Sequence, residues 1–202
     1  MKKLLLLLLI PIFSNAQEVF FYSGKNFTKY DYKSSDGSKP DLFNRVGDYY
    51  EIGYQDELIE EKLNYQLSLT YNEFNSSGGD SANIYRWQSS YAGIKGNIVY
   101  NLFDAYRSGF QVNLKAGANF STIVNGEQEI NGTLFDLSDE DEFKGLQIQP
   151  TFGFNVNYAV SDIGYLSVGY NFSKSFRLGS TTEEKLSFNN SQLQFGIHIP
   201  IN

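Results

Sequence analysis

Residues 110–121 read FQVNLKAGANFS, and every second residue from Phe110 to Phe120 is apolar. The residues between them are Gln, Asn, Lys, Gly, Asn and Ser. Successive side chains of a β-strand point to opposite faces, so this alternation is typical of a strand with one apolar and one polar face. The segment predicts a long strand.

The same alternation recurs along the chain. It is clear over residues 63–72, 146–160, 166–173 and 193–201, and less regular over 19–32, 50–55 and 92–102. The segment 19–32 carries aromatic residues on both faces, so its orientation stays open. Trp87 and Tyr91 break the alternation before residue 92, and residues 56–62 fit either a turn or a helical turn. These patterns predict eight strands in all.

The predicted connections differ in length along the chain. The first, third, fifth and seventh are long and rich in Gly, Ser, Asp and Asn, over residues 33–46, 75–83, 125–144 and 179–185. The others, over 56–62, 104–109 and 161–164, are short. Long loops at one end and short turns at the other are typical of an outer-membrane barrel. The pattern predicts an all-β protein, an eight-stranded antiparallel up-and-down transmembrane β-barrel over residues 17–202.

The first residues have the pattern of a secretory signal. Lys2 and Lys3 precede an apolar run over residues 4–13, and Ser14-Asn15-Ala16 follows. A spanning helix needs about 20 apolar residues, so a signal peptide cleaved after Ala16 is the better interpretation than an anchor. Residues 1–16 are therefore predicted to be removed on export.

The composition excludes several function classes. The 202 residues include no cysteine and one histidine, which removes disulfides, thiolate metal sites and sites built from several histidines. A net charge of −7 argues against nucleic acid as a partner, because binding to phosphate backbones needs clustered Lys and Arg. No cofactor is expected.

The two faces of the strands indicate which side meets lipid. The apolar face is crowded with Phe, Tyr and Leu, whereas the polar face is mostly Gln, Asn, Ser, Thr and Gly. A water-facing surface normally carries many charges, and eight strands leave room only for modest side chains inside. A membrane barrel is therefore favoured over a soluble, lipocalin-like one. The predicted lumen-lining residues are Glu51, Lys95, Asn97, Gln111, Asn113, Lys115, Gln147, Gln149, Asn155 and His198.

The last predicted strand carries an assembly signal. Gln194, Gly196, Ile199 and Ile201 have the spacing of the terminal-strand motif that barrel-assembly machinery recognises, although the chain continues to Asn202. With this motif, the chain resembles the small eight-stranded outer-membrane β-barrel family, which includes the porin-family OmpA-like transmembrane domains and the OmpX-like barrels. The resemblance implies the outer membrane of a Gram-negative bacterium, periplasmic termini, extracellular long loops, and contact with outer-membrane lipid and lipopolysaccharide. It extends to no catalytic motif.

Two sets of residues are candidates for chemistry. His198 is the single imidazole, and some barrels of this class are lipid-modifying hydrolases with a Ser–His pair. Its predicted place near the periplasmic end favours a hydrogen-bonding role over catalysis. Asp136, Asp139 and Asp141 lie in an acidic loop that is able to offer oxygen ligands to Ca²⁺, but a solvated loop is the commoner explanation.

The sequence thus leaves four functions open. The first is a non-enzymatic barrel that presents its extracellular loops or serves as an accessory subunit of a larger outer-membrane complex. The second is a narrow channel or porin for small solutes or ions, although a lumen plugged by hydrogen bonds is favoured. The third is a lipid-modifying enzyme, and the fourth is a soluble periplasmic binding barrel.

Overall fold

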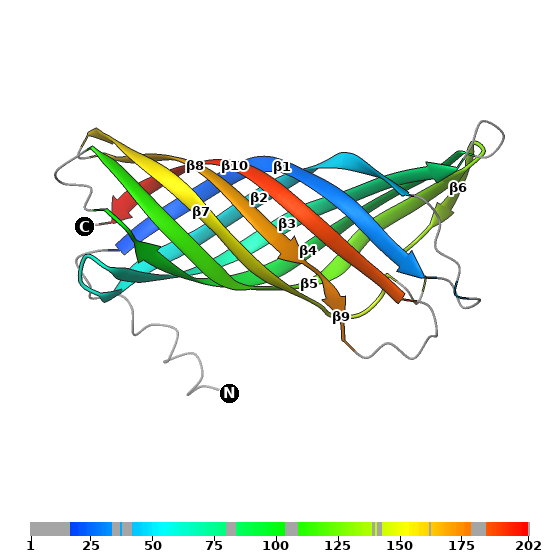
Figure 1. Ribbon diagram of the computed structural model, residues 1–202, viewed down its shortest axis with the longest axis horizontal. Coiled ribbons are helices and arrows are strands. Elements are labelled where there is room, and N and C mark those ends of the chain that lie inside the picture. Colours follow the sequence, from blue (N-terminus) through cyan, green and yellow to red (C-terminus); the bar gives the residue numbers. More distant parts are fainter. Residues whose placement is uncertain are drawn as a thin grey trace.

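The computed structural model describes residues 17–33, 37, 42–79, 84–103, 109–138, 140, 143–161, 163–178 and 185–201 (Figure 1). The predicted signal peptide, residues 1–16, lies outside the described residues. The strands are β1 (Gln17–Lys33), β2 (Leu42–Ile59), β3 (Leu63–Gly79), β4 (Ile84–Asn101), β5 (Phe110–Ile130), β6 (Thr133–Asp136), β7 (Gln147–Ser161), β8 (Gly164–Lys174), β9 (Phe176–Arg177) and β10 (Lys185–Ile201). No helix in this part of the chain is long and apolar enough to cross a membrane.

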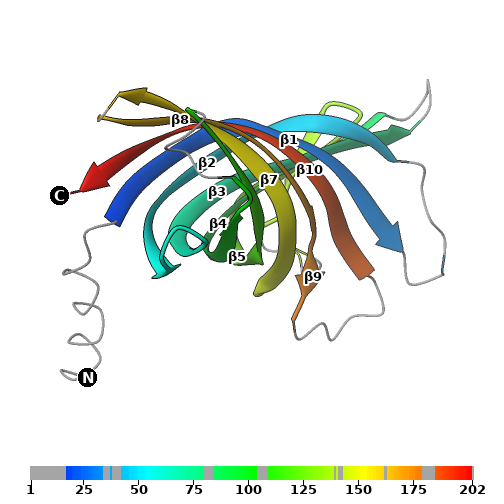
Figure 2. The ribbon, with the colours of Figure 1, turned by 60° about the vertical axis from the view of Figure 1, so that its left-hand side comes forward.

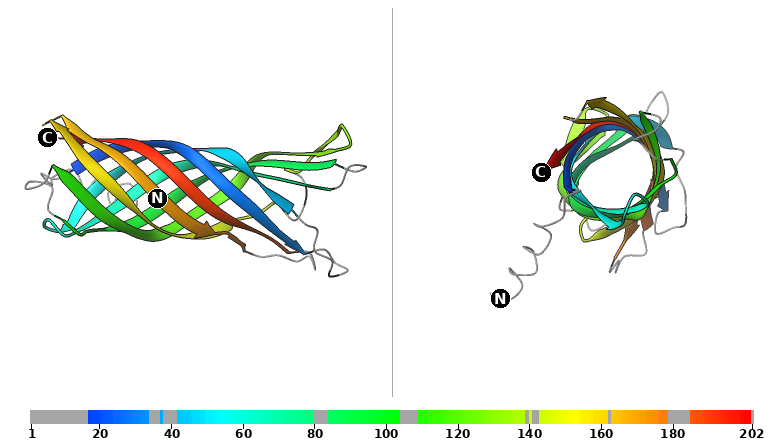
Figure 3. Two further views of the ribbon diagram at one scale, coloured as in Figure 1. Left: turned by 45° about the horizontal axis from the view of Figure 1, so that its top comes forward. Right: turned by 90° about the vertical axis from the view of Figure 1, so that its left-hand side faces the viewer.

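Eight of these strands close into a ring. Neighbouring strands pair in the order β5-β4-β3-β2-β1-β10-β8-β7, and a further pairing of β5 with β7 closes the circle. All pairings are antiparallel, and the view along the barrel axis shows the ring (Figure 3). The predicted eight-stranded antiparallel barrel is confirmed. Gln17 pairs with Ile201, so β1 begins where β10 ends, and we call this the terminal end. The opposite end is the distal end.

The strands run further at the distal end than the sequence pattern predicted. Parts of the expected loops 33–46, 75–83 and 125–144 are strand, because β2 begins at Leu42, β3 reaches Gly79 and β5 continues to Ile130. There Asn131 (φ 50°) and Gly132 (φ 84°) form a two-residue turn into β6. Asn-Gly is the preferred dipeptide for such a hairpin, since both residues need a positive φ. The distal end of the barrel carries a ribbon made of β3 to β6 (Figure 1).

The irregular stretch before residue 92 lies beside a β-bulge in β5. The pairing of β4 with β5 shifts between Ser90 and Tyr91. The extra residue is Val124 of β5, because Asn125 pairs with Ser90 and Ile123 pairs with Tyr91, so β4 itself keeps its alternation. Trp87 and Tyr91 have the same parity as Lys95 and Asn97 and lie inward, so the pattern seemed broken only because the inward face was expected to be polar.

The orientation of β1, left open by the sequence, is decided by the barrel. Phe20, Tyr22 and Tyr30 point inward and are at most 3% exposed, whereas Phe21 and Phe27 point outward and are 42% exposed. Within the segment 56–62, residues 56–59 continue β2 and residues 60–62 form a tight turn, in which the amide of Lys62 donates to the carbonyl of Ile59 at 3.0 Å.

The outer wall of the barrel is an apolar belt, and the tilted strands that carry it are seen in Figure 2. Outward Ile52, Leu69, Leu166 and Phe195 are 51–61% exposed, while inward Gln, Asn and Lys side chains are buried. Tyrosine pairs border the belt, with Tyr54 beside Tyr65 and Tyr50 beside Tyr71, each at 6.3 Å between ring centroids. This inverted arrangement is that of a barrel in lipid, with aromatic girdles at the interfaces.

Candidate functional site

The middle of the lumen holds a buried ion pair. The Lys95 ammonium lies 3.2 Å from the Glu51 carboxylate, and the two side chains are 4% and 1% exposed. Ser68 donates to Glu51 at 2.6 Å, and Tyr49 donates to it as well. These residues come from the inward faces of the neighbouring strands β2, β3 and β4. Both oxygens of the Glu51 carboxylate accept hydrogen bonds, one from Ser68 and the other from Tyr49 and Lys95.

A second lysine enters the same region from β5. Lys115 donates to the amide oxygen of Gln194 at 3.0 Å, and its ammonium lies 4.7 Å from the centroid of the Tyr22 ring. The side chain is 2% exposed. The centre of the lumen therefore gathers two ammonium groups around one carboxylate, and the carbonyl dipole and aromatic ring stabilise the second cation.

Amide side chains fill the lumen between this centre and the distal end. Asn26 accepts hydrogen bonds from Gln192 at 2.7 Å and from Asn190 at 2.9 Å, and it donates to Asn72 at 3.3 Å. A void between Tyr49, the centre and these amides measures about 10 Å³, which is the space of about one water molecule. This part of the lumen is packed.

Aromatic side chains form a second layer at the distal end. What we call the distal aromatic layer consists of five aromatic residues and one leucine, all buried: Tyr30, Phe74, Tyr91, Phe143, Phe188 and Leu137. Phe188 lies at its centre, with ring centroids 4.6 Å from Tyr30 and 5.0 Å from Phe74. The Tyr30 hydroxyl donates to the carbonyl of Phe74 at 2.7 Å, which holds the layer to β3.

A recess of about 320 Å³ opens over this layer. Its walls carry Tyr32, Leu42, Trp87, Gln128, Glu140 and Leu186, and its floor is shared with Tyr30, Leu137 and Phe143. Trp87 is the single tryptophan of the chain. A mainly apolar recess with a few polar groups at its rim has the general composition of a binding site.

His198 lies in a hydrogen-bonded chain at the terminal end. Its Nδ1 is 2.9 Å from the Glu18 carboxylate and its Nε2 is 2.7 Å from the Tyr22 hydroxyl, which is 3.3 Å from Ser167 Oγ. The ring of Phe20 stacks on the imidazole, with 5.4 Å between the ring centroids. The ring is 1% exposed and both of its nitrogens have partners. This arrangement is suited to holding β10, β1 and β8 together.

The predicted lumen residues lie on the inward faces of their strands. Buried are Glu51, Lys95, Asn97, Asn113, Lys115, Gln147, Gln149, Asn155 and His198, and Gln111 is partly buried. The sequence reasoning missed Tyr22, Tyr49 and Phe20, because it expected only modest side chains inside. Tyr49 lies two residues before Glu51 in β2, so strand parity alone would have found it, whereas Phe20 and Tyr22 lie in β1, whose orientation the sequence left open.

The candidate cation loop is described only in part. Asp136 is exposed, and its carboxylate accepts hydrogen bonds from the hydroxyl and the amide of Ser138 at 2.6 and 2.7 Å. These bonds hold the pKa of Asp136 below its usual range. Asp139 and Asp141 lie outside the described residues. Within the described part of the chain, no group of three His, Cys, Asp or Glu side chains is placed to hold a metal ion.

The residues of the predicted assembly signal divide between the two faces of β10. Gln194 is fully buried, and Gly196 faces the Tyr22 ring. Ile199 and Ile201 point outward and are 48% and 44% exposed. Recognition of this motif by assembly machinery stays a prediction.

Comparison with known proteins identifies relatives by fold. No protein-family model and no curated protein matches the chain. OprG of Pseudomonas aeruginosa is 12% identical, with 93% of this chain and 98% of that chain covered and a TM-score of 0.55. Neisserial surface protein A is 14% identical over 92% and 97% of the two chains, with a TM-score of 0.48. The outer-membrane enzyme PagL is 14% identical over 91% and 99%, with a TM-score of 0.45.

These findings define the class of the protein. The closed ring of eight strands and the exposed apolar belt are those of the small outer-membrane β-barrel proteins with transmembrane strands. At such low sequence identity the similarity concerns the fold, and the role of the chain has to be argued from its own residues.

Proposed function

We propose that this protein is a non-enzymatic barrel of the bacterial outer membrane that acts through its outer surfaces. In this proposal the chain termini are periplasmic and the distal end faces the exterior. The barrel presents the distal ribbon, the neighbouring loops and the recess to partners, either alone or as an accessory subunit of a larger outer-membrane complex.

The observation that carries the proposal is the filling of the lumen at two levels. The polar centre around Glu51 and Lys95 lies below the distal aromatic layer, and both are buried. A void among the amides next to the polar centre is about the size of one water molecule. A solute or ion would have to displace both layers to cross, which favours a surface role over the narrow-channel alternative.

The surroundings of His198 do not favour the enzyme alternative. Both imidazole nitrogens are engaged with Glu18 and Tyr22, and the ring is buried at the terminal end. A general base needs access to the substrate proton that it removes. With the distal end outside, a lipid of the outer leaflet would lie at the opposite end of the barrel from this histidine.

We expect the purified barrel to be electrically silent in planar lipid bilayers. An ion would have to displace the two buried layers to cross the lumen, so no conductance steps should appear at ordinary voltages. Single-channel recording at several salt concentrations measures this directly, with an open porin from the same preparation as the positive control. Reproducible ion-selective steps would favour the channel alternative.

The surface role predicts that partners engage the recess. We expect binding of a partner to change the fluorescence of Trp87, the single tryptophan, because it lines the recess. The partner is sought by mild detergent extraction of outer membranes, followed by measurement of native size. A stoichiometric complex that changes Trp87 emission supports the accessory role, and a lone barrel supports the self-standing one. A partner that binds without any effect on Trp87 would place the contact elsewhere.

A further inference from the structure

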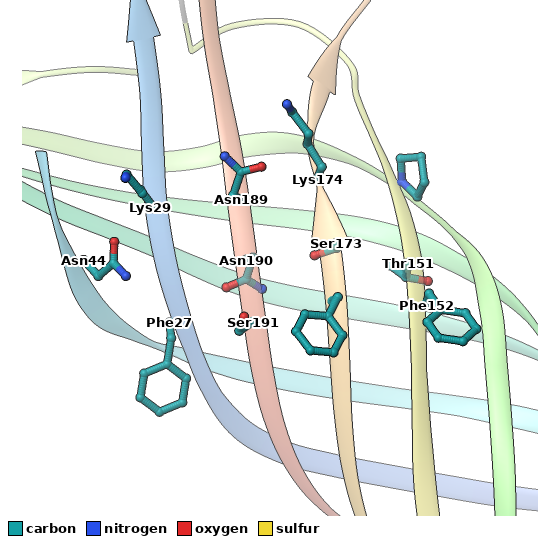
Figure 4. A pocket seen from close by; sticks show the side chains of 12 residues that line it. Phe27, Lys29, Asn44, Thr151, Phe152, Ser173, Lys174, Asn189, Asn190 and Ser191 are labelled. Atoms are coloured by element: carbon teal, nitrogen blue, oxygen red, sulfur yellow. The ribbon is translucent and has the colours of Figure 1, made fainter. Parts of the chain in front are cut away.

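A shallow groove lies on the outer wall where β1, β10, β8 and β7 run side by side (Figure 4). Its volume is about 530 Å³. The strand register arranges the outward residues into two rows, a lower row of Phe27, Ser191, Phe172 and Phe152 and an upper row of Lys29, Asn189 and Lys174. Asn44 and Pro150 complete the outward lining.

The lower row has the shape of a channel for a hydrocarbon chain. Phe27, Phe172 and Phe152 project outward and are 42%, 52% and 58% exposed. Ser191 lies between the first two of these in the register, and its short side chain leaves the floor of the groove low. An alkyl chain lying over Ser191 would contact aromatic rings on both sides.

The upper row carries two lysines that share one strand as a neighbour. Lys29 of β1 and Lys174 of β8 flank Asn189 of β10, so their backbones are about 10 Å apart, two strand spacings. Both flexible side chains are long enough to approach one ligand between them. A phosphate suits this place, because lysine binds it as a point charge and Asn189 adds a neutral donor.

These two lysines differ from Lys25 and Arg86, two other cations of the outer wall. Lys25 is paired with Asp48, and Arg86 is paired with Glu129 at 3.1 Å. Within the described part of the chain, neither Lys29 nor Lys174 has an ion-pair partner. The ammonium of Lys174 lies 5.7 Å from the centroid of the Phe176 ring. Asp31, two residues further along β1 than Lys29, has an interaction of its own.

The groove crosses the upper edge of the apolar belt. Along β8 the outward residues are apolar from Leu166 to Phe172, and Lys174 is the first charge. Along β10 the outward residues change from Phe195 and Leu193 to Ser191 and Asn189 in the same direction. The lower row therefore lies at the level of lipid chains, and the upper row lies at the level of head groups.

We propose that this groove is a binding site for a lipid that carries a phosphate on its head group. The acyl chain lies over Ser191 between Phe27 and Phe172, and Lys29 and Lys174 hold the phosphate from two sides. Lipid is favoured as the occupant because the groove joins an apolar floor inside the membrane belt to a cationic rim at its edge. Assignment of this lipid to the outer leaflet rests on the orientation proposed above.

The test is a lipid titration of the full-length mature barrel in mild detergent, followed by native mass spectrometry. The probes are lipid A and its dephosphorylated form with the same acyl chains. We expect the phosphorylated form to bind more tightly. The double variant Lys29→Gln/Lys174→Gln should lose about fivefold in affinity for each lysine, about 25-fold in all. The variant Ser191→Trp, with both lysines in place, should also lose affinity because it fills the floor.

The matched control is the double variant Lys25→Gln/Arg86→Gln, which makes the same change in net charge at two paired cations of the outer wall. Its affinity for lipid A should stay within about twofold of the original protein. Equal binding of both lipid forms, or equal losses in the two double variants, would overturn the site. If the groove variants lose a co-purifying protein but still bind lipid A like the original protein, the groove is a protein interface instead. Because this assay does not depend on orientation in the membrane, its failure leaves the proposed surface role standing.

Discussion

Replacing Glu51 by Gln is expected to lower the free energy of unfolding by about 3–5 kcal/mol, the usual cost of removing one partner from a buried ion pair. The substitution keeps the size of the side chain but leaves the ammonium groups of Lys95 and Lys115 in the lumen without a counter-charge. Lys95 lies 3.2 Å from Glu51 and is 4% exposed, so water is not available to replace the carboxylate. Urea titration of the barrel in lipid vesicles, followed by Trp87 fluorescence, measures the loss.

Two controls separate the effect of the lost charge on stability from the effect of changed packing. Glu129→Gln changes the same residue type in an exposed pair with Arg86 and should cost at most about 1 kcal/mol. Combining Glu51→Gln with Lys95→Met should recover part of the stability, since the unpaired charge is removed together with its partner. A Glu51→Gln loss no larger than the Glu129→Gln loss would show that the ion pair does not stabilise the lumen.

Replacing Phe188 by Ala is expected to cost about 3–5 kcal/mol, the range for removing a large aromatic side chain from a packed interior. Phe188 is fully buried and its ring contacts those of Tyr30, Phe74 and Tyr91 at centroid distances of 4.6, 5.0 and 5.7 Å. Its neighbours come from different strands of a closed ring and are unable to collapse onto the space. The same urea titration reports the change.

The matched control lies on the same strand. Phe195 is 56% exposed on the outer wall, and lipid chains are able to fill the space that Phe195→Ala creates. We therefore expect a clearly smaller loss at Phe195 than at Phe188. Similar losses at the two positions would mean that the distal aromatic layer is not tightly packed, and they would weaken the argument that it seals the barrel.

The inward and outward faces were predictable because they depend on a local property. Side chains alternate along any strand, so the parity of Glu51, Lys95, Lys115 and His198 could be read directly from the residues around them. The exceptions have physical causes. The bulge at Val124 shifts parity inside β5, and the Asn-Gly turn extends β5 into a hairpin where a loop was expected.

The sequence by itself determined that the chain forms amphipathic strands, that eight of them build the barrel, and which side the residues of the regular strands face, β1 excepted. Only the tertiary structure decided which inward residues meet. Glu51 meets Lys95, 44 residues away, and His198 meets Glu18, 180 residues away. The same closure aligned Lys29 and Lys174 on either side of Asn189. Alternation follows from the geometry of a single strand, whereas these contacts follow from the stagger of strands around a closed ring, which hydrogen bonding between distant segments sets.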